Sequence, residues 1–164
     1  DHVSAMAIDK PSFKKVLGSF AAGVTIITTV GEDGTPYGLT ATAFTSVSLE
    51  PPLVLVCVDK RAESLPHLLS SRRFCVSLLA AGQDDLSNRF ARSGGDKFAG
   101  VEVHAGSLGV PHLAEALAYL ECATTEVIDG GDHTIFVGQV EAGDATDGEP
   151  LVYFRGAYRQ LISL

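Results

Sequence analysis

The chain has 164 residues, of which 12 are basic and 20 acidic, and its formal net charge is −8 at pH 7. A chain of this length buries about two-thirds of its unfolded surface and can form one domain with a real core. It lacks both the basic stripe of a nucleic-acid-binding protein and an apolar run near the roughly 20 residues of a membrane span. We expect a cytoplasmic protein of one domain, residues 1–164, with a flexible N-terminus at residues 1–9 and neither nucleic acid nor membrane as a partner.

The first third of the chain predicts a helix followed by extended segments. In DKPSFKKVLGSFAAG, residues 9–23, Asp9 is a suitable N-cap, Pro11 fits the first turn, apolar residues recur at helical spacing and Gly23 is the expected end. Residues 24–43 predict a hairpin, because VTIITTV is β-branched throughout and GEDGTP is rich in turn formers. The run LVLVCV, residues 53–58, is apolar on both faces, as a strand covered on both sides would be.

The remainder predicts short helices and further strands. One helix is expected from about Glu63 in ESLPHLLSS, and another in GQDDLSNRFARSGG, ending at the glycine pair 94–95. The segments RRFCVSLL, AYLECATTEVI, HTIFVGQVEA and PLVYFRGAYRQL predict strands, and DGGD and GDATDGEP predict turns between the later ones. Six or seven strands with three short helices indicate a mainly β fold, an antiparallel barrel with helical covers.

Metal and nucleotide motifs are missing from the sequence. The cysteines Cys57, Cys75 and Cys122 are widely spaced in apolar segments, which predicts buried reduced thiols. No histidine pair has zinc-ligand spacing, and neither CxxC nor HExxH occurs, so we expect no metal site. No GxGxxG follows a strand, and GGDKFAG lacks the GxxxxGK(S/T) form, so Rossmann and P-loop sites are unsupported.

A hydroxyl-rich run directly precedes the apolar strand in GLTATAFTSVSLEPPLVLVCVD, residues 38–59. After a strand ending near Thr42, residues 43–48 carry three hydroxyls, and Pro51 and Pro52 are expected to force the backbone out of regular pairing. Free N–H groups and hydroxyls could donate to the edge of a planar heterocycle or to a phosphate. A polar bend that caps its own backbone is the alternative interpretation.

Charged residues follow the same strand in VCVDKRAES. Ser64 lies near the start of a predicted short helix, where unpaired N–H groups and the helix dipole favour a phosphate. Lys60 and Arg61 could add charge-assisted contacts to that phosphate. An exposed charged turn would account for these residues equally well.

Five motifs together resemble one family, the short-chain NAD(P)H:flavin oxidoreductases with the flavin-reductase-like, FMN-binding split-barrel fold. They are, in chain order, FAAGVTIITT, GLTATAFTSVSLEPPLVLVCVD, NRFA with DKF downstream, GDHTIFVGQV and PLVYFRGAYRQL. The resemblance runs from about Phe13 to Leu161, and its second and fourth motifs are the most specific. It implies a homodimer of split β-barrels, with flavin in a groove near the dimer interface.

The resemblance also implies site residues. Residues 40–46 would line the isoalloxazine and ribityl chain, although the family often has Asn where Thr42 stands. The full implied flavin set is Thr40, Ala41, Thr42, Ala43, Phe44, Thr45, Ser46, Ser48, Asp59, Lys60, Arg61 and Ser64, with the last five toward the phosphate. His133 matches the histidine beside the nicotinamide. Secondary contacts with nicotinamide or flavin would come from Asn88, Arg89, Phe90, Tyr153, Arg155 and Tyr158.

The implied activity is hydride transfer from NADH or NADPH to N5 of FMN or FAD. The protein would act by holding the two rings at about 3–3.5 Å rather than by acid–base catalysis. Because the chain has no Trp and its flavin segment offers only Phe44, we expect a loosely held flavin that leaves reduced and supplies a flavin-dependent monooxygenase. The alternatives are a tight FMN-binding protein, either a pyridoxine-phosphate-oxidase-like enzyme or an electron carrier, and a non-enzymatic flavin-binding module.

Overall fold

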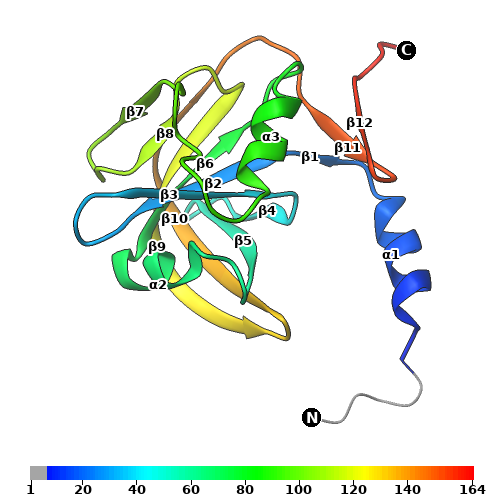
Figure 1. Ribbon diagram of the computed structural model, residues 1–164, viewed down its shortest axis with the longest axis horizontal. Helices are drawn as coiled ribbons and strands as arrows, with labels where there is room; N and C mark the ends of the chain where they lie inside the picture. The colour runs from blue at the N-terminus through cyan, green and yellow to red at the C-terminus, as the bar shows by residue number, and fades with distance from the viewer. Residues whose placement is uncertain (1–6) are drawn as a thin grey trace.

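The computed structural model describes residues 7–164, so the first six residues of the expected flexible N-terminus lie outside the described part (Figure 1). The helices are α1 (Lys10–Gly18), α2 (Leu65–Ser71) and α3 (Asp84–Phe90). The strands are β1 (Ala22–Gly23), β2 (Thr25–Val30), β3 (Pro36–Ala41), β4 (Phe44–Ser48), β5 (Leu53–Asp59), β6 (Arg73–Leu78), β7 (Val103–Ala105), β8 (Pro111–Leu113), β9 (Ala118–Gly130), β10 (His133–Ala145), β11 (Val152–Phe154) and β12 (Ala157–Arg159).

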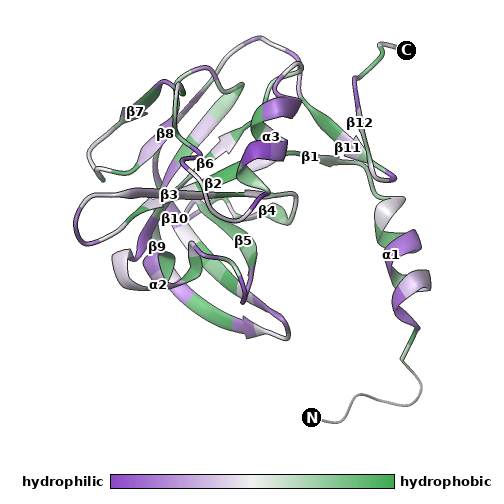
Figure 2. Ribbon diagram, viewed as in Figure 1, coloured by the Kyte–Doolittle hydropathy of each residue, from purple (hydrophilic) through white to green (hydrophobic). Residues whose placement is uncertain are grey.

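A seven-stranded antiparallel sheet in the order β3-β2-β6-β9-β10-β5-β4 forms the body of the molecule. Two small sheets accompany it, β1-β11-β12 and the ribbon β7-β8. The long strands β9 and β10 pair from His133↔Gly130 to Ala145↔Ala118 and curve across the body in bands of alternating hydropathy (Figure 2). The predicted mainly β, antiparallel fold with three short helices is confirmed.

Helix α1 forms where the sequence predicts it, because the Asp9 carboxylate accepts a hydrogen bond from the Ser12 amide at 2.9 Å. It ends at Gly18 rather than Gly23, since residues 22–23 pair with β11 as strand β1. The helix projects from the body (Figure 1), and its apolar side chains Phe13, Val16 and Leu17 are 53%, 62% and 51% exposed. The apolar face of α1 therefore packs on little of its own chain.

The hairpin predicted over residues 24–43 is confirmed, with β2 and β3 paired from Thr25↔Ala41 to Val30↔Pro36. Helix α2 begins two residues after the expected start at Glu63. Helix α3 ends at Phe90, before the glycine pair, and Gly94 and Gly95 both take positive φ in the loop that follows. No helix among the described residues is long and apolar enough to cross a membrane.

The core lies on the inner face of the sheet, where Val54, Val56 and Val58 of β5 pack with Phe74 and Phe136. The prediction that β5 is covered on both faces is wrong for the single chain. Its alternate residues Leu53, Leu55 and Cys57 point outward and are only half-buried, because side chains alternate between the two faces of a strand. All three cysteines are free and Cys75 and Cys122 are buried, as predicted, but the prediction of a buried thiol is wrong for Cys57, which is half-buried on the outward face of β5.

Residues 43–48 were expected to leave regular pairing, and this expectation is wrong. Residues 44–48 form β4, which pairs with β5 through Phe44↔Val56, Thr45↔Leu55 and Ser46↔Val54 and carries an irregularity before Ser48. Pro51 and Pro52 lie in the turn after β4 and so do not interrupt it. Because β4 is an edge strand of the seven-stranded sheet, only one side of the β4 backbone is paired with a neighbouring strand.

Candidate functional site

A cleft of about 410 Å³ opens beside the end of β5, between β3 and the segment that begins with α3. We call it the first cleft. It brings together residues that were predicted to belong to one site and that come from three separate segments, and these are Thr40, Asp59, Arg61, Ser64 and Phe90. Hydroxyl and guanidinium donors therefore line a space of the size typical for small-molecule sites.

The packing of α3 on β3 forms one wall of the first cleft. The Thr40 hydroxyl donates to the Ser87 carbonyl at 2.6 Å, which ties the strand to the helix. The buried Phe90 ring lies against Gly38, where a Cβ atom would come within 2.9 Å of that ring. Glycine at position 38 is thus required for the helix to approach the strand this closely.

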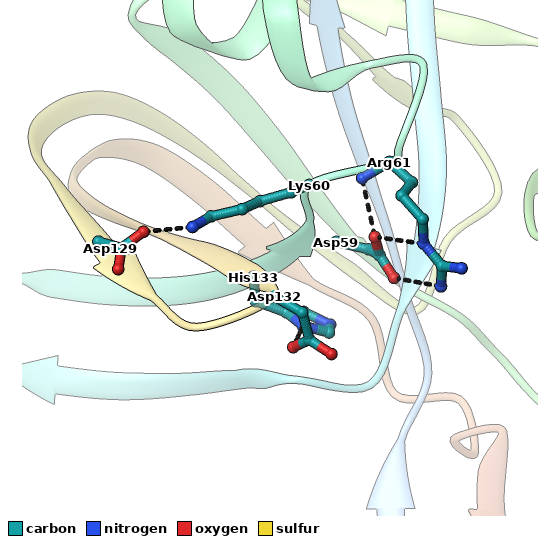
Figure 3. Close-up of polar contacts among 6 residues, drawn as sticks. All are labelled: Asp59, Lys60, Arg61, Asp129, Asp132 and His133. Carbon is teal, nitrogen blue, oxygen red and sulfur yellow. Dashed lines mark hydrogen bonds and ion pairs between the residues drawn. The ribbon is translucent and has the colours of Figure 1, made fainter. Parts of the chain in front are cut away.

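Asp59 and Arg61 form a closed ion pair at the mouth of the first cleft (Figure 3). The Arg61 amide and Nε donate to Asp59 Oδ1 at 2.8 and 3.1 Å, and Nη2 donates to Oδ2 at 3.0 Å. These hydrogen bonds from Arg61 lower the pKa of Asp59 to about 2. The Arg61 side chain is 91% exposed, so its remaining N–H donors face solvent beside the cleft.

Lys60 points away from the first cleft, because its ammonium pairs with Asp129 near the end of β9 (Figure 3). His133 begins β10 directly opposite Asp59 in the β5–β10 register, so it lies at the same end of the sheet as the cleft. Its Nδ1 lies 2.7 Å from Asp132 Oδ1, and this hydrogen bond lowers the pKa of Asp132. The ring is partly exposed and held by a neighbouring carboxylate.

Three of the predicted secondary contacts meet between α3 and the C-terminal hairpin. Tyr158 Oη lies 2.7 Å from Ser87 Oγ and donates to Asn88 Oδ1 at 2.9 Å. The Tyr153 ring packs against Tyr158 with centroids 5.4 Å apart. This cluster borders α3 on the side of the hairpin rather than lining the first cleft.

The two predicted arginines have separate local roles. Arg89 Nη1 donates to the Ala99 carbonyl at 2.9 Å and so anchors the loop after α3. Arg155 takes a positive φ of 50° between β11 and β12, and its guanidinium stacks on Phe154 at 5.0 Å from the ring centroid. Neither arginine lines the first cleft.

The predicted flavin residues that follow Thr40 in the β3–β4 segment lie in three places. Thr42 and Phe44 line an apolar hollow of about 210 Å³ beside β1, and Ala41 is buried in the core. The remaining residues lie along the edge strand and its approach, where Ala43, Thr45 and Ser46 are exposed and Ser48 is half-buried. In one chain none of these residues lines the first cleft.

Several lining residues of the first cleft were missed by sequence reasoning, namely Leu39, Ala62, Glu63, Ala91, Ser93 and Lys97. Most of them carry no sequence signal, because ordinary apolar or surface residue types occupy these positions. Lys97 stands in the DKF motif and carries a charged side chain, yet no role was assigned to it.

Comparisons with known proteins agree with this arrangement. The family model described as "Flavin reductase like domain" matches residues 17–162. The chain is 43% identical to the reductase component of 4-nitrophenol 4-monooxygenase/4-nitrocatechol 2-monooxygenase of Rhodococcus opacus, over 94% of this chain and 83% of that protein. It is 41% identical to a flavin reductase (NADH) of Kitasatospora aureofaciens, over 92% of this chain and 81% of that protein.

Among solved structures, the chain resembles the NADH:FAD oxidoreductase SgcE6 of Streptomyces globisporus C-1027, determined in complex with NAD and FAD fragments. The TM-score is 0.88 and the sequence identity is 39%, over 96% of this chain and 98% of that chain. The split-barrel fold expected from the sequence is confirmed by this likeness.

Replacing Arg61 with Ala is expected to raise the pKa of Asp59 from about 2 toward its ordinary value of 3.8, because the carboxylate loses its side-chain donors. A lowered carboxyl pKa stabilises the fold above the unfolded-state pKa, about 3.9, and this contribution is lost as the pH falls toward 2. Titration of the Asp59 carboxyl carbon by NMR measures the shift. Lys60→Ala is the matched control, since it should raise the pKa of Asp129 alone. An unchanged Asp59 titration in Arg61→Ala would contradict the ion pair.

Proposed function

We propose that this chain, which belongs to the flavin reductase like family, is an NADH-dependent flavin reductase that supplies reduced flavin to a separate flavin-dependent monooxygenase. The observation that carries the proposal is the match over residues 17–162 combined with the first cleft, where predicted flavin residues from distant segments converge. The relatives named above are reductase components or flavin reductases.

The donor set of the first cleft fits a phosphorylated flavin. We place the phosphate end of FMN or FAD near Arg61 and Ser64, because Arg61 keeps unused N–H donors at the mouth of the cleft. Lys60 would have to leave Asp129 to contribute. When bound, the flavin supplies the hydride-accepting N5 and the nicotinamide supplies the hydride. The protein's part is to bind and orient both molecules.

His133 is placed beside the nicotinamide. It lies at the cleft end of the β5–β10 pair, its ring is partly exposed, and Asp132 fixes the ring through Nδ1. A planar ring held by a carboxylate can pack against the nicotinamide without taking a proton from it. The cluster of Asn88, Tyr153 and Tyr158 is proposed as a secondary contact, since Ser87 connects it to Thr40 of the first cleft.

A homodimer is the second part of the proposal. The outward face of β5, with Leu53, Leu55 and Cys57, is only half-buried in the single chain, and the apolar side chains of α1 are more than half exposed. Exposed apolar surface of this kind is typical of an interface between subunits. A second copy against β4 and β5 would also enclose residues 43–48, which the single chain leaves at its edge.

A diffusible flavin is favoured over a tightly held one. The only aromatic side chain that lines the first cleft within the described residues is Phe90, which is buried against Gly38. An aromatic sandwich around the isoalloxazine is thus unsupported. A cytoplasmic location, where reduced nicotinamide and a monooxygenase would be met, remains part of the prediction.

The first prediction of this proposal concerns turnover. The purified protein is expected to oxidise NADH, followed by its absorbance under air, only when FMN, FAD or riboflavin is added, with a rate that saturates in flavin. Flavin that survives gel filtration, together with slow NADH oxidation, would instead favour the tight FMN-binding alternative. Flavin binding without turnover of NADH or NADPH would indicate a non-enzymatic module.

Replacing His133 with Ala is expected to raise the KM for NADH about tenfold, the equivalent of one lost contact of about 1.4 kcal/mol. The dissociation constant for flavin should change less than about twofold, because His133 is placed against the nicotinamide. Steady-state kinetics and flavin fluorescence titration measure the two quantities. His104→Ala on β7, outside the proposed site, is the control. Equal losses in both quantities would count against the assignment.

Light scattering is expected to give twice the chain mass of 17.2 kDa for the purified protein. Val16→Glu places a charge on the apolar face of α1 and should shift the mass toward the monomer. Lys15→Glu introduces the same residue on the opposite face of α1 and should leave the dimer intact. A monomeric wild-type protein would refute the dimer, and an unaffected Val16→Glu dimer would exclude α1 from its interface.

A further inference from the structure

Lys97 is a partly buried cation without a carboxylate partner. Its Nζ donates to the Gly38 carbonyl at 3.1 Å and to the Phe90 carbonyl at 3.2 Å, which connects β3 to the end of α3. Among residues 7–164, no carboxylate oxygen lies within 4.0 Å of this ammonium. An ammonium has three N–H donors, so one remains beyond the two carbonyls. Burial lowers the pKa of Lys97, and the negative charge of Glu63 opposes this shift only in part.

A second hollow of about 450 Å³ adjoins the first cleft. We call it the second cleft. It is lined by residues 35–38 of the β2–β3 hairpin and by residues 95–98 of the loop after α3. Glu63, Ser64 and Lys97 line both clefts. The two spaces therefore meet at Lys97, beside the position proposed for the flavin phosphate.

The acidic residues around the second cleft are engaged by backbone amides. Glu63 Oε2 accepts from the Gly94 amide at 3.1 Å, and Asp96 Oδ1 accepts from the Phe98 amide at 3.2 Å. These hydrogen bonds hold the loop around Lys97. Neither carboxylate accepts a hydrogen bond from the Lys97 ammonium, so its third N–H can donate to a ligand. An anionic group at the junction would meet the free donor of the lysine.

Aromatic side chains form part of the second cleft. The Tyr37 ring stacks on His67 with centroids 3.6 Å apart and planes 8° apart, and Phe98 packs edge-on against Phe90 at 5.0 Å. A rigidly held tyrosine and a phenylalanine are the side chains on which a nucleobase stacks, whatever its sequence identity. The second cleft thus offers aromatic surface beyond a cationic junction.

We propose that the second cleft binds the adenosine diphosphate moiety of a dinucleotide, with Lys97 donating to a pyrophosphate oxygen and the adenine near Tyr37. The inference rests on the proposed function. FMN ends at its single phosphate in the first cleft, whereas FAD continues past Lys97. NADH carries the same moiety, and the experiment separates these two sources.

The experiment compares Lys97→Met with Lys97→Arg and the wild type by flavin fluorescence titration without NADH. For Lys97→Met we expect the FAD dissociation constant to rise about tenfold and the FMN constant to change less than about twofold. Lys97→Arg should keep most of the FAD affinity because it retains the charge and donors. ADP should compete with FAD in the wild type and fail to do so in Lys97→Met.

A second measurement is needed if the FAD dissociation constant of Lys97→Met equals that of the wild type. It tests whether the second cleft binds the adenosine diphosphate moiety of NADH. If the KM for NADH with FMN as acceptor rises about tenfold in Lys97→Met, the second cleft holds the NADH moiety instead. Equal weakening of FMN and FAD, or no change in any of the three constants, would overturn the proposal. The FMN and FAD titrations need no turnover, so a failure of the proposed reductase activity would be seen separately in the wild-type NADH assay.

Lys97 also connects β3 to α3, so the folding of Lys97→Met must be checked by circular dichroism. Thr35→Trp provides an independent test, because Thr35 is exposed and lines the second cleft but not the first. This variant keeps Lys97 and should narrow the second cleft. The expected result is the same selective loss of FAD or NADH affinity with FMN unaffected. Unchanged affinities for all three would contradict the proposed site.

Discussion

The close packing of α3 on β3 is the contact on which both clefts depend. Gly38 removes the one side chain that would hold the helix off the strand, and the Phe90 ring fills the resulting space. Thr40 and Lys97 then fix the helix to the same strand through the carbonyls of Ser87, Gly38 and Phe90. Because this contact sets the position of α3, it also places the Ser87–Tyr158 link and the loop that closes the second cleft.

Local chemistry was enough to predict much of the fold from the sequence. The Asp9 cap and the β-branched hairpin over residues 24–43 depend on neighbours close in the chain, and both are confirmed. Residues 43–48 were misinterpreted because a proline interrupts strand pairing only at its own position, and strand β4 ends before Pro51 and Pro52. The outward face of β5 was misjudged because an apolar strand does not reveal whether its own chain covers it.

The site could be predicted only where a motif carries its own chemistry. Asp59, Arg61 and Ser64 follow one another in the chain, so their convergence follows from a single turn. Lys97 joins them through a loop that Glu63 and Asp96 fold by accepting from backbone amides, and such long-range closure leaves no periodic signal. For the same reason no sequence pattern indicates that Thr42 and Phe44 line a different hollow from Thr40.

A chain with a net charge of −8 must bind anionic nucleotides against its own long-range field. The structure meets this requirement locally. Asp59, Asp129 and Asp132 are each paired with a cation or a histidine, while Glu63 and Asp96 accept from amides. Arg61 and Lys97 thereby retain donors toward the two clefts. A site built on a few such donors, without an aromatic sandwich, is suited to a nucleotide that must leave after each turnover.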